Sequence, residues 1–149
     1  MKKLLKKLTA AVLTATVIMA MGVAAFAANG DVATHQAALY KEGTYGTDSK
    51  VESMGNGAIG ETNAQENSDG TFTVTVGLVE DFKAYGITSN MREITVNGTA
   101  ATMLDQDGNG KYDAFQFTES MAFPQKLTVS FTIKSSIMPI SATGDLVIY

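Results

Sequence analysis

Apolar side chains recur at every second position in two stretches of this chain, and no other sequence feature constrains the fold as strongly. In residues 71–78, phenylalanine, valine and leucine alternate with threonine and glycine. In residues 127–133, leucine, valine, phenylalanine and isoleucine alternate with threonine and serine. Because successive side chains of a strand point to opposite faces of its sheet, each stretch predicts a β-strand with one buried face.

Shorter segments carry the same signal. Asn97-Gly98 favours a tight hairpin turn between two of them, because both residues tolerate a positive φ. The additional strands are expected within residues 36–40, 94–96, 99–104, 114–118 and 144–149. About seven to eight short strands separated by turn signals predict an all-β fold, a β-sandwich.

Two segments are least like strands. Residues 42–67 are rich in glycine, serine, threonine and asparagine, and residues 80–91 also lack a strand pattern. We expect the first to be a long loop with at most one turn of helix. Binding residues often collect on such loops, which a rigid scaffold holds in place.

The N-terminus has the three-part layout of a secretory signal peptide. Four lysines within residues 2–7 precede the uncharged stretch 8–28, which contains the small-residue triplet Ala25-Phe26-Ala27. Threonines dilute the stretch, so we expect cleavage after Ala27 and a secreted, extracellular domain of residues 28–149. The alternative is an uncleaved signal that anchors the domain to the outer face of the membrane, since about 20 apolar residues can span a bilayer.

Removal of the signal peptide makes the chain strongly acidic. Four of the eleven basic residues and none of the fifteen acidic ones lie in it, which leaves seven against fifteen and a net charge near −8. This charge argues against nucleic acid and anionic lipid as partners, because both need clustered Lys and Arg. The chain has no cysteine, which excludes disulfides and thiolate metal sites. We therefore expect a single domain held by packing alone.

The sequence carries no recognisable catalytic motif. His35 is the only histidine and has no companion at metal-ligand spacing. The motifs G-x-S-x-G and H-E-x-x-H are both absent from the chain. We therefore predict a binding or structural protein and not an enzyme.

One polar segment has the spacing of a calcium loop. Asp105, Asp107, Asn109 and Asp113 occupy its first, third, fifth and ninth positions, and calcium takes six or more oxygen ligands. Gln116 stands at the twelfth position and cannot supply the bidentate carboxylate. The favoured interpretation is a glycine- and aspartate-rich turn between two strands, which needs no metal. Calcium is the alternative.

Two methionines have unusual settings. Methionine usually fills gaps in a core, but Met54 lies inside the long polar loop, and Met138 lies at the join between the last two predicted strands. In these settings, either methionine could serve as a ligand and not as a filler of the core.

The segments Ser53–Ala58, Asp69–Val76 and Leu127–Tyr149 resemble the NEAT (near iron transporter) family of Gram-positive surface and secreted proteins. The likeness covers Gln36–Tyr149. It implies an immunoglobulin-like β-sandwich that holds haem in a groove between a short 3₁₀ helix in the long loop and the hairpin of the last two strands.

The resemblance also implies roles for individual residues. Ser53 matches the serine that binds a haem propionate, and Met54 matches the residue that covers the distal face of the iron. Haem-binding members typically carry Tyr-x-x-x-Tyr on the final strand, but this chain lacks it and has Met138 at about the position of the first tyrosine. Either haem binding was lost, or Met54 and Met138 ligate iron from opposite faces, where thioethers favour the ferrous state.

Apolar walls for such a groove would come from the last two strands and their join. The candidates are Phe131, Ile133, Ile137 and Ile140, which would serve equally well as ordinary packing. We therefore expect a secreted, reversible haem carrier whose partners are haem or haem-carrying proteins. The alternative is an extracellular interaction or structural sandwich without haem, with or without calcium, that binds other cell-surface proteins.

Overall fold

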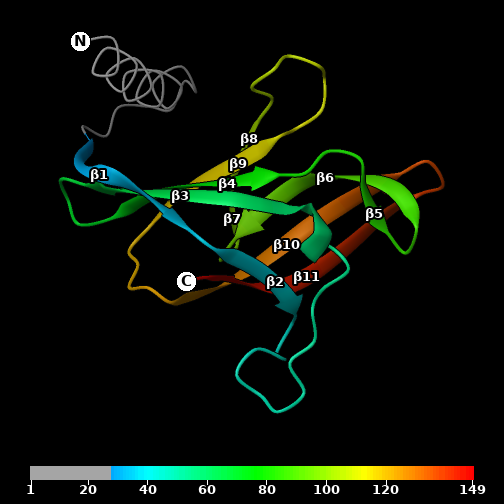
Figure 1. Cartoon of the computed structure of the whole chain (residues 1–149), viewed down its shortest axis with the longest axis horizontal. Coiled ribbons are helices and arrows are strands. Elements are labelled where there is room, and N and C mark those ends of the chain that lie inside the picture. Colours follow the sequence, from blue (N-terminus) through cyan, green and yellow to red (C-terminus); the bar gives the residue numbers. More distant parts are fainter. Residues whose placement is uncertain (1–27) are drawn as a thin grey trace, which may run out of the picture.

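The computed structural model describes residues 28–149, which form two antiparallel β-sheets packed face to face (Figure 1). The first, sheet A, has the order β1 (Ala28–His35), β3 (Ile59–Asn67), β4 (Phe72–Leu78), β9 (Ala114–Glu119), β8 (Thr102–Leu104). The second, sheet B, has the order β2 (Ala37–Lys41), β11 (Pro139–Ile148), β10 (Gln125–Ser135), β6 (Ile87–Val96), β5 (Phe82–Ala84), and β7 (Thr99–Ala100) pairs with β6. The predicted all-β sandwich is confirmed. The predicted signal peptide lies outside the described residues.

The core lies between the sheets and is built from the alternating residues that the sequence indicates. Val74 and Val76 of β4 and Phe131 and Ile133 of β10 are buried in one cluster with residues from both sheets. Each such side chain contributes about 1.5–3 kcal/mol when it is removed from water. The two strands predicted within residues 71–78 and 127–133 are thus confirmed, with their apolar faces inward.

The N-terminal segment crosses from one sheet to the other. β1 pairs with β3 in sheet A, and after Gln36 the chain continues as β2 beside β11 in sheet B. The lone histidine lies at this crossing: the His35 ring stacks on Phe123 with centroids 4.1 Å apart, and its Nδ1 lies 2.6 Å from the Tyr149 carbonyl oxygen. Through these contacts, His35 packs against residues next to the point where the chain passes from sheet A to sheet B.

The predicted hairpin turn is confirmed, but the strand after it is divided. Asn97 and Gly98 have φ of 48° and 82° and connect β6 to β7. The single strand expected at residues 99–104 is two: β7 pairs with β6 in sheet B, and β8 pairs with β9 in sheet A. The chain changes sheets at Ala101.

The structure has strands in both segments that lack a strand pattern in the sequence, so the single long loop expected at residues 42–67 is wrong in part. β3 occupies the second half of the expected loop 42–67, and β5 and the start of β6 occupy much of residues 80–91. In β3 the buried positions are taken by Thr62, Ala64 and Asn67, which are small or polar and so carry a weak alternation signal. β1 was not expected at all, and β11 begins five residues earlier than the predicted 144–149 strand.

Candidate functional site

The predicted short 3₁₀ helix is present as η1 (Asn56–Ala58). The segment leading into it is fixed to β2 by two hydrogen bonds at Leu39. The Leu39 amide donates to Asn56 Oδ1 at 2.8 Å, and the Leu39 carbonyl accepts from the Ser53 amide at 2.9 Å. Residues 53–58, called the η1 segment below, therefore have a defined position at the edge of sheet B.

The η1 segment reaches the core through a glycine. A methyl group at Gly55 would lie 2.9 Å from Met91 Cε, 3.0 Å from Leu39 Cδ2 and 3.0 Å from Phe131 Cε2. Only a residue without a side chain allows the segment to approach β10 and β6 this closely. The η1 segment thus lies directly against the core-facing side of β10.

Ser53 and Met54 differ in how much of their side chains remains free. Ser53 Oγ accepts one bond, from the Gly55 amide at 3.3 Å, so its hydroxyl proton can still be donated to an anionic oxygen. Met54 is half-buried and packs against the core cluster. Of the two, Ser53 is the better prepared for a ligand.

The other half of the predicted site is the hairpin formed by β10 and β11. Ser135 closes its turn: the hydroxyl oxygen accepts from the amides of Ile137 and Met138 at 3.2 and 3.3 Å and donates to the Met138 carbonyl at 3.0 Å. Beyond this turn the apolar side chains are uncovered. Ile137 is 71% exposed, Met138 60% and Ile140 37%.

The side chains of Phe131 and Ile133 pack in the core and not against a ligand, although Phe131 is one of the residues around a hollow beside Thr132 and Ala142. Phe131 and Ile133 are 2% and 0% exposed and belong to the core between the sheets, so their predicted place as groove walls is corrected. Ile140 pairs with Ile133 across the hairpin, and cross-strand partners share a face. Ile140 is nevertheless partly exposed, while Ile133 is covered completely.

A tyrosine that the sequence analysis did not single out lies at the same end. Tyr85 and Gly86, with φ of 51° and 78°, form the turn between β5 and β6, and Tyr85 is 79% exposed. Ser89 of β6 pairs with Ser135 of β10, so the two turns lie at one end of sheet B, as Figure 1 shows. The sequence signal that could have identified this tyrosine is the pair Tyr85-Gly86, because glycine favours a turn and the segment lacks the apolar–polar alternation of a strand. The four residues Tyr85, Ile137, Met138 and Ile140 are called the hairpin end below.

The predicted calcium loop connects β8 to β9, and the structure brings part of the predicted ligand set together. Carboxylate oxygens of Asp107 and Asp113 lie within 4.8 Å of each other and of a third acid, Glu80. Asp105 is not in this group, because its two oxygens accept the amides of Asn109 and Gly110 at 3.1 and 2.9 Å. Asp105 therefore shapes the loop.

Glu80 was missed because it comes from a distant connection, between β4 and β5. The Leu78 amide donates to the Asp113 carbonyl at 2.7 Å, and this backbone bond brings the end of β4 beside the loop. Only knowledge of the β4–β9 pairing could have predicted it.

An ion pair ties the same two connections together. Lys111 Nζ lies 2.6 Å from Asp81 Oδ2. The hydrogen bond from Lys111, followed by that from Asn90, lowers the pKa of Asp81, and the bond to Asp81 raises the pKa of Lys111. Both side chains are well exposed, so solvent screens the pair.

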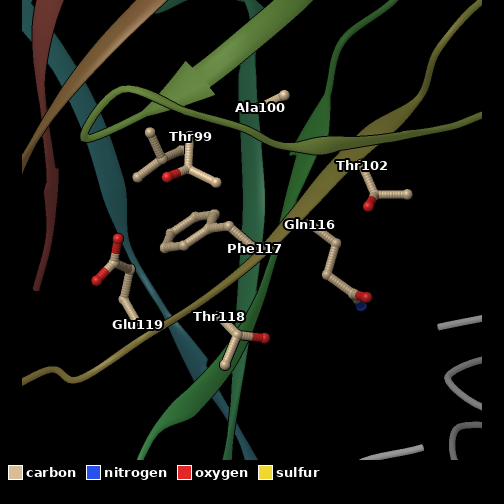
Figure 2. Close-up of a pocket in the computed structure, with 8 residues that line it drawn as sticks. Thr99, Ala100, Thr102, Gln116, Phe117, Thr118 and Glu119 are labelled. Carbon is tan, nitrogen blue, oxygen red and sulfur yellow. The ribbon is translucent and has the colours of Figure 1, made fainter. Parts of the chain in front are cut away.

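A hollow of about 280 Å³ lies where the chain passes from β7 to β8. Figure 2 shows the side chains that line it. Phe117 lies between the threonines of that crossing and Glu119. The volume of this hollow is below the roughly 300–1,000 Å³ that is typical of small-molecule sites. None of the predicted site residues lines it, and we assign it no function.

Within residues 28–149 the structure has no helix with the length and hydrophobicity needed to cross a membrane. Neither a known protein family nor a curated protein matches this chain.

Proposed function

We propose that this domain is a secreted, reversible haem carrier that binds haem between the η1 segment and the hairpin end. The observation that carries the proposal is the exposure of Ile137, Met138 and Ile140 on the last hairpin, whose other apolar side chains are buried or, at Ala142, half-buried. Contiguous exposed apolar side chains mark binding surfaces. A flat, mostly apolar ligand with charged propionates suits an apolar surface with a few polar groups nearby.

Ser53 supplies the polar group in this proposal. Its hydroxyl is half-buried on the η1 segment, and the proton left free by its bond with Gly55 can be donated to a propionate. A hydrogen bond to an ionised acceptor is about twice as strong as a neutral one. Ser53 would therefore orient the haem and fix which edge faces the η1 segment.

Met138 is the residue we propose to contact the iron. Its side chain is mostly exposed, and the Ser135 turn fixes its backbone. When bound, haem supplies an iron that takes a soft, neutral thioether, which favours the ferrous state. Met54 is the second candidate, but it packs against the core and would have to leave that contact to reach a ligand.

An absorption titration of the mature domain with haem tests the proposal, under both reducing and oxidising conditions. We expect a saturable one-to-one Soret shift, tighter for ferrous haem, that weakens at least about tenfold in Met138→Ala, or roughly 1.4 kcal/mol. Met121→Ala is the control for loss of a methionine away from the proposed site, since Met121 lies between β9 and β10 and packs against the core. No saturable shift, or equal affinity in Met138→Ala and wild type, would refute it.

Tyr85 favours a second candidate function, recognition of a cell-surface protein. Exposed tyrosine beside apolar side chains is typical of protein interfaces. The hairpin end would then be the contact surface and haem would play no part. This candidate would be selected by two results together: a haem titration without a saturable Soret shift, and binding to a cell-surface protein that is lost in Tyr85→Ala.

A further inference from the structure

We propose that the hairpin end docks onto a phospholipid surface, with its apolar side chains at the headgroup boundary and two lysines behind them. The inference goes beyond the proposed haem carrier, because it uses some of the same side chains but does not require haem. The mature chain as a whole is strongly acidic, which argues against anionic lipid. The charge at this end of sheet B is the opposite of that overall charge.

The apolar side chains of the hairpin end belong to two turns that lie side by side. Ile137 and Met138 are in the turn between β10 and β11, and Tyr85 is in the turn between β5 and β6, at the same end of sheet B (Figure 1). All three side chains are more than half exposed. Aliphatic side chains beside a tyrosine suit a membrane surface, where the tyrosine ring lies among apolar groups and its hydroxyl stays in water.

The longer of these two turns has few free backbone groups. The Ser135 hydroxyl accepts from the amides of Ile137 and Met138 and donates to the Met138 carbonyl. An unsatisfied backbone group is costly in an apolar medium, so a turn can enter the edge of a bilayer at low cost only when such bonds are made internally. A protein partner could itself supply hydrogen bonds to an open turn. The internal bonds therefore favour a lipid surface over a protein.

The charged residues at this end are all basic. Residues 82–91 and 131–142 contain Lys83 and Lys134 and no acidic residue. Both lysines are exposed, and within residues 28–149 neither forms an ion pair. Basic side chains beside an apolar surface attract the phosphate groups of lipids. The local charge thus complements a phospholipid surface, although the charge of the whole domain does not.

The nearest acidic residues along these strands lie outside that region. Asp81 precedes β5 and is paired with Lys111, and Glu93 lies farther along β6. Lys134 directly precedes Ser135, three residues before Ile137. A lysine set back in this way can extend its ammonium to the headgroups while the apolar side chains reach deeper.

Sedimentation of the mature domain with haem-free vesicles tests the proposal. The vesicles are phosphatidylcholine, alone or with about one fifth phosphatidylglycerol, and we expect saturable binding that is at least about fivefold tighter with the anionic lipid. Ile137→Ser should weaken binding to both vesicles at least about fivefold, because less apolar area is buried. Val51→Ser is the control, since Val51 is also an exposed apolar residue but lies in another connection, and it should bind as wild type does.

Two lysines of one strand separate a local charge effect from a general one. Lys134→Gln should weaken binding to the anionic vesicles about fivefold and leave binding to pure phosphatidylcholine nearly unchanged. Lys126→Gln is the matched control, because Lys126 is an exposed lysine at the opposite end of β10. It should have no comparable effect on either vesicle.

A spectroscopic readout tests the depth of docking. The chain has no tryptophan, so Ile137→Trp introduces a unique fluorescent side chain. Its emission should move to shorter wavelength when vesicles are added, because the indole leaves water, while Val51→Trp should show no shift.

Three results would overturn the proposal: no sedimentation with either vesicle, equal binding by Ile137→Ser and wild type, or equal losses in Lys134→Gln and Lys126→Gln. The first of these would leave a protein as the remaining macromolecular partner for the hairpin end. The haem titration contains no lipid and the vesicle experiment contains no haem, so either proposal can fail alone.

Discussion

The hairpin end and the β8–β9 connection (residues 105–113, called the acidic loop below) are both exposed connections at strand ends, but they are held in opposite ways. In the acidic loop the side chains predicted as calcium ligands also fold the loop: oxygens of Asp105, Asp107 and Asp113 accept backbone amides. At the hairpin end, the Ser135 hydroxyl closes the turn through backbone groups, and the side chains of Ile137 and Met138 are mostly exposed. Ligand groups are thus preorganised in one region and free in the other.

This difference predicts how substitutions act. Changes in the acidic loop should alter stability, while changes at the hairpin end should alter binding alone. The η1 segment is an intermediate case, because it is anchored to the core through Gly55 yet carries Ser53 toward the proposed ligand.

Among the connections between strands, the largest effect on stability is expected at Gly55. Gly55→Ala should destabilise the domain by about 1–2 kcal/mol, because the new methyl group would lie within about 3.0 Å of three core side chains. Gly57→Ala is the matched control: the nearest atom to its methyl would be Phe82 Cδ2 at 3.6 Å, an ordinary contact, so we expect a change within about 0.5 kcal/mol. Urea unfolding measures both. Equal stability of the two variants would show that the η1 segment is not packed as described.

The second effect concerns the loop itself. Asp105→Ala removes the acceptor of two backbone amides, and we expect a loss of about 1 kcal/mol when unfolding is measured in EDTA. Asp48→Ala, another exposed aspartate, should change the free energy of unfolding by less than about 0.5 kcal/mol. If the two variants unfold alike, the loop is not held by its own side chains and the contrast with the hairpin end fails.

How far the sequence predicted these regions depends on side-chain size and on pairing. β4 and β10 were predicted because large apolar residues alternate in them, and the Asn97-Gly98 turn because its φ values are particular to those residues. β3 was missed because small or polar residues, Thr62, Ala64 and Asn67, fill its buried positions. Alternation marks a residue as buried but does not say against what, which is why Phe131 and Ile133 were expected beside a ligand.

The acidic site shows the same limit. Asp107 and Asp113 were predicted because their spacing lies within one loop, and local spacing is visible in sequence. Glu80 joins them through the Leu78–Asp113 backbone bond between strands that are distant in sequence. No local pattern contains that information.

A third, smaller effect concerns the ion pair beside the loop. The lowered pKa of Asp81 means that its contribution to stability is present above the ordinary pKa of 3.8 and is lost as the pH falls through the lower folded value. The raised pKa of Lys111 acts in the opposite direction, and its contribution is lost at high pH. Asp81→Asn should therefore flatten the acid limb of a Tm-against-pH curve slightly. A wild-type curve with the same acid limb as the variant would contradict the pairing.

The smallest effect on stability is expected at the hairpin end, where it sharpens the comparison most. Ile137→Ser removes an apolar side chain that is 71% exposed, so the free energy of unfolding should change by less than about 0.5 kcal/mol. Ile133→Ser, on the same hairpin but fully buried, should cost several times more, since it leaves both a cavity and a buried hydroxyl. Haem affinity should nevertheless fall in Ile137→Ser. If Ile137→Ser destabilises the fold as Ile133→Ser does, then Ile137 is a packing residue, and its exposure cannot be used to argue for a binding surface.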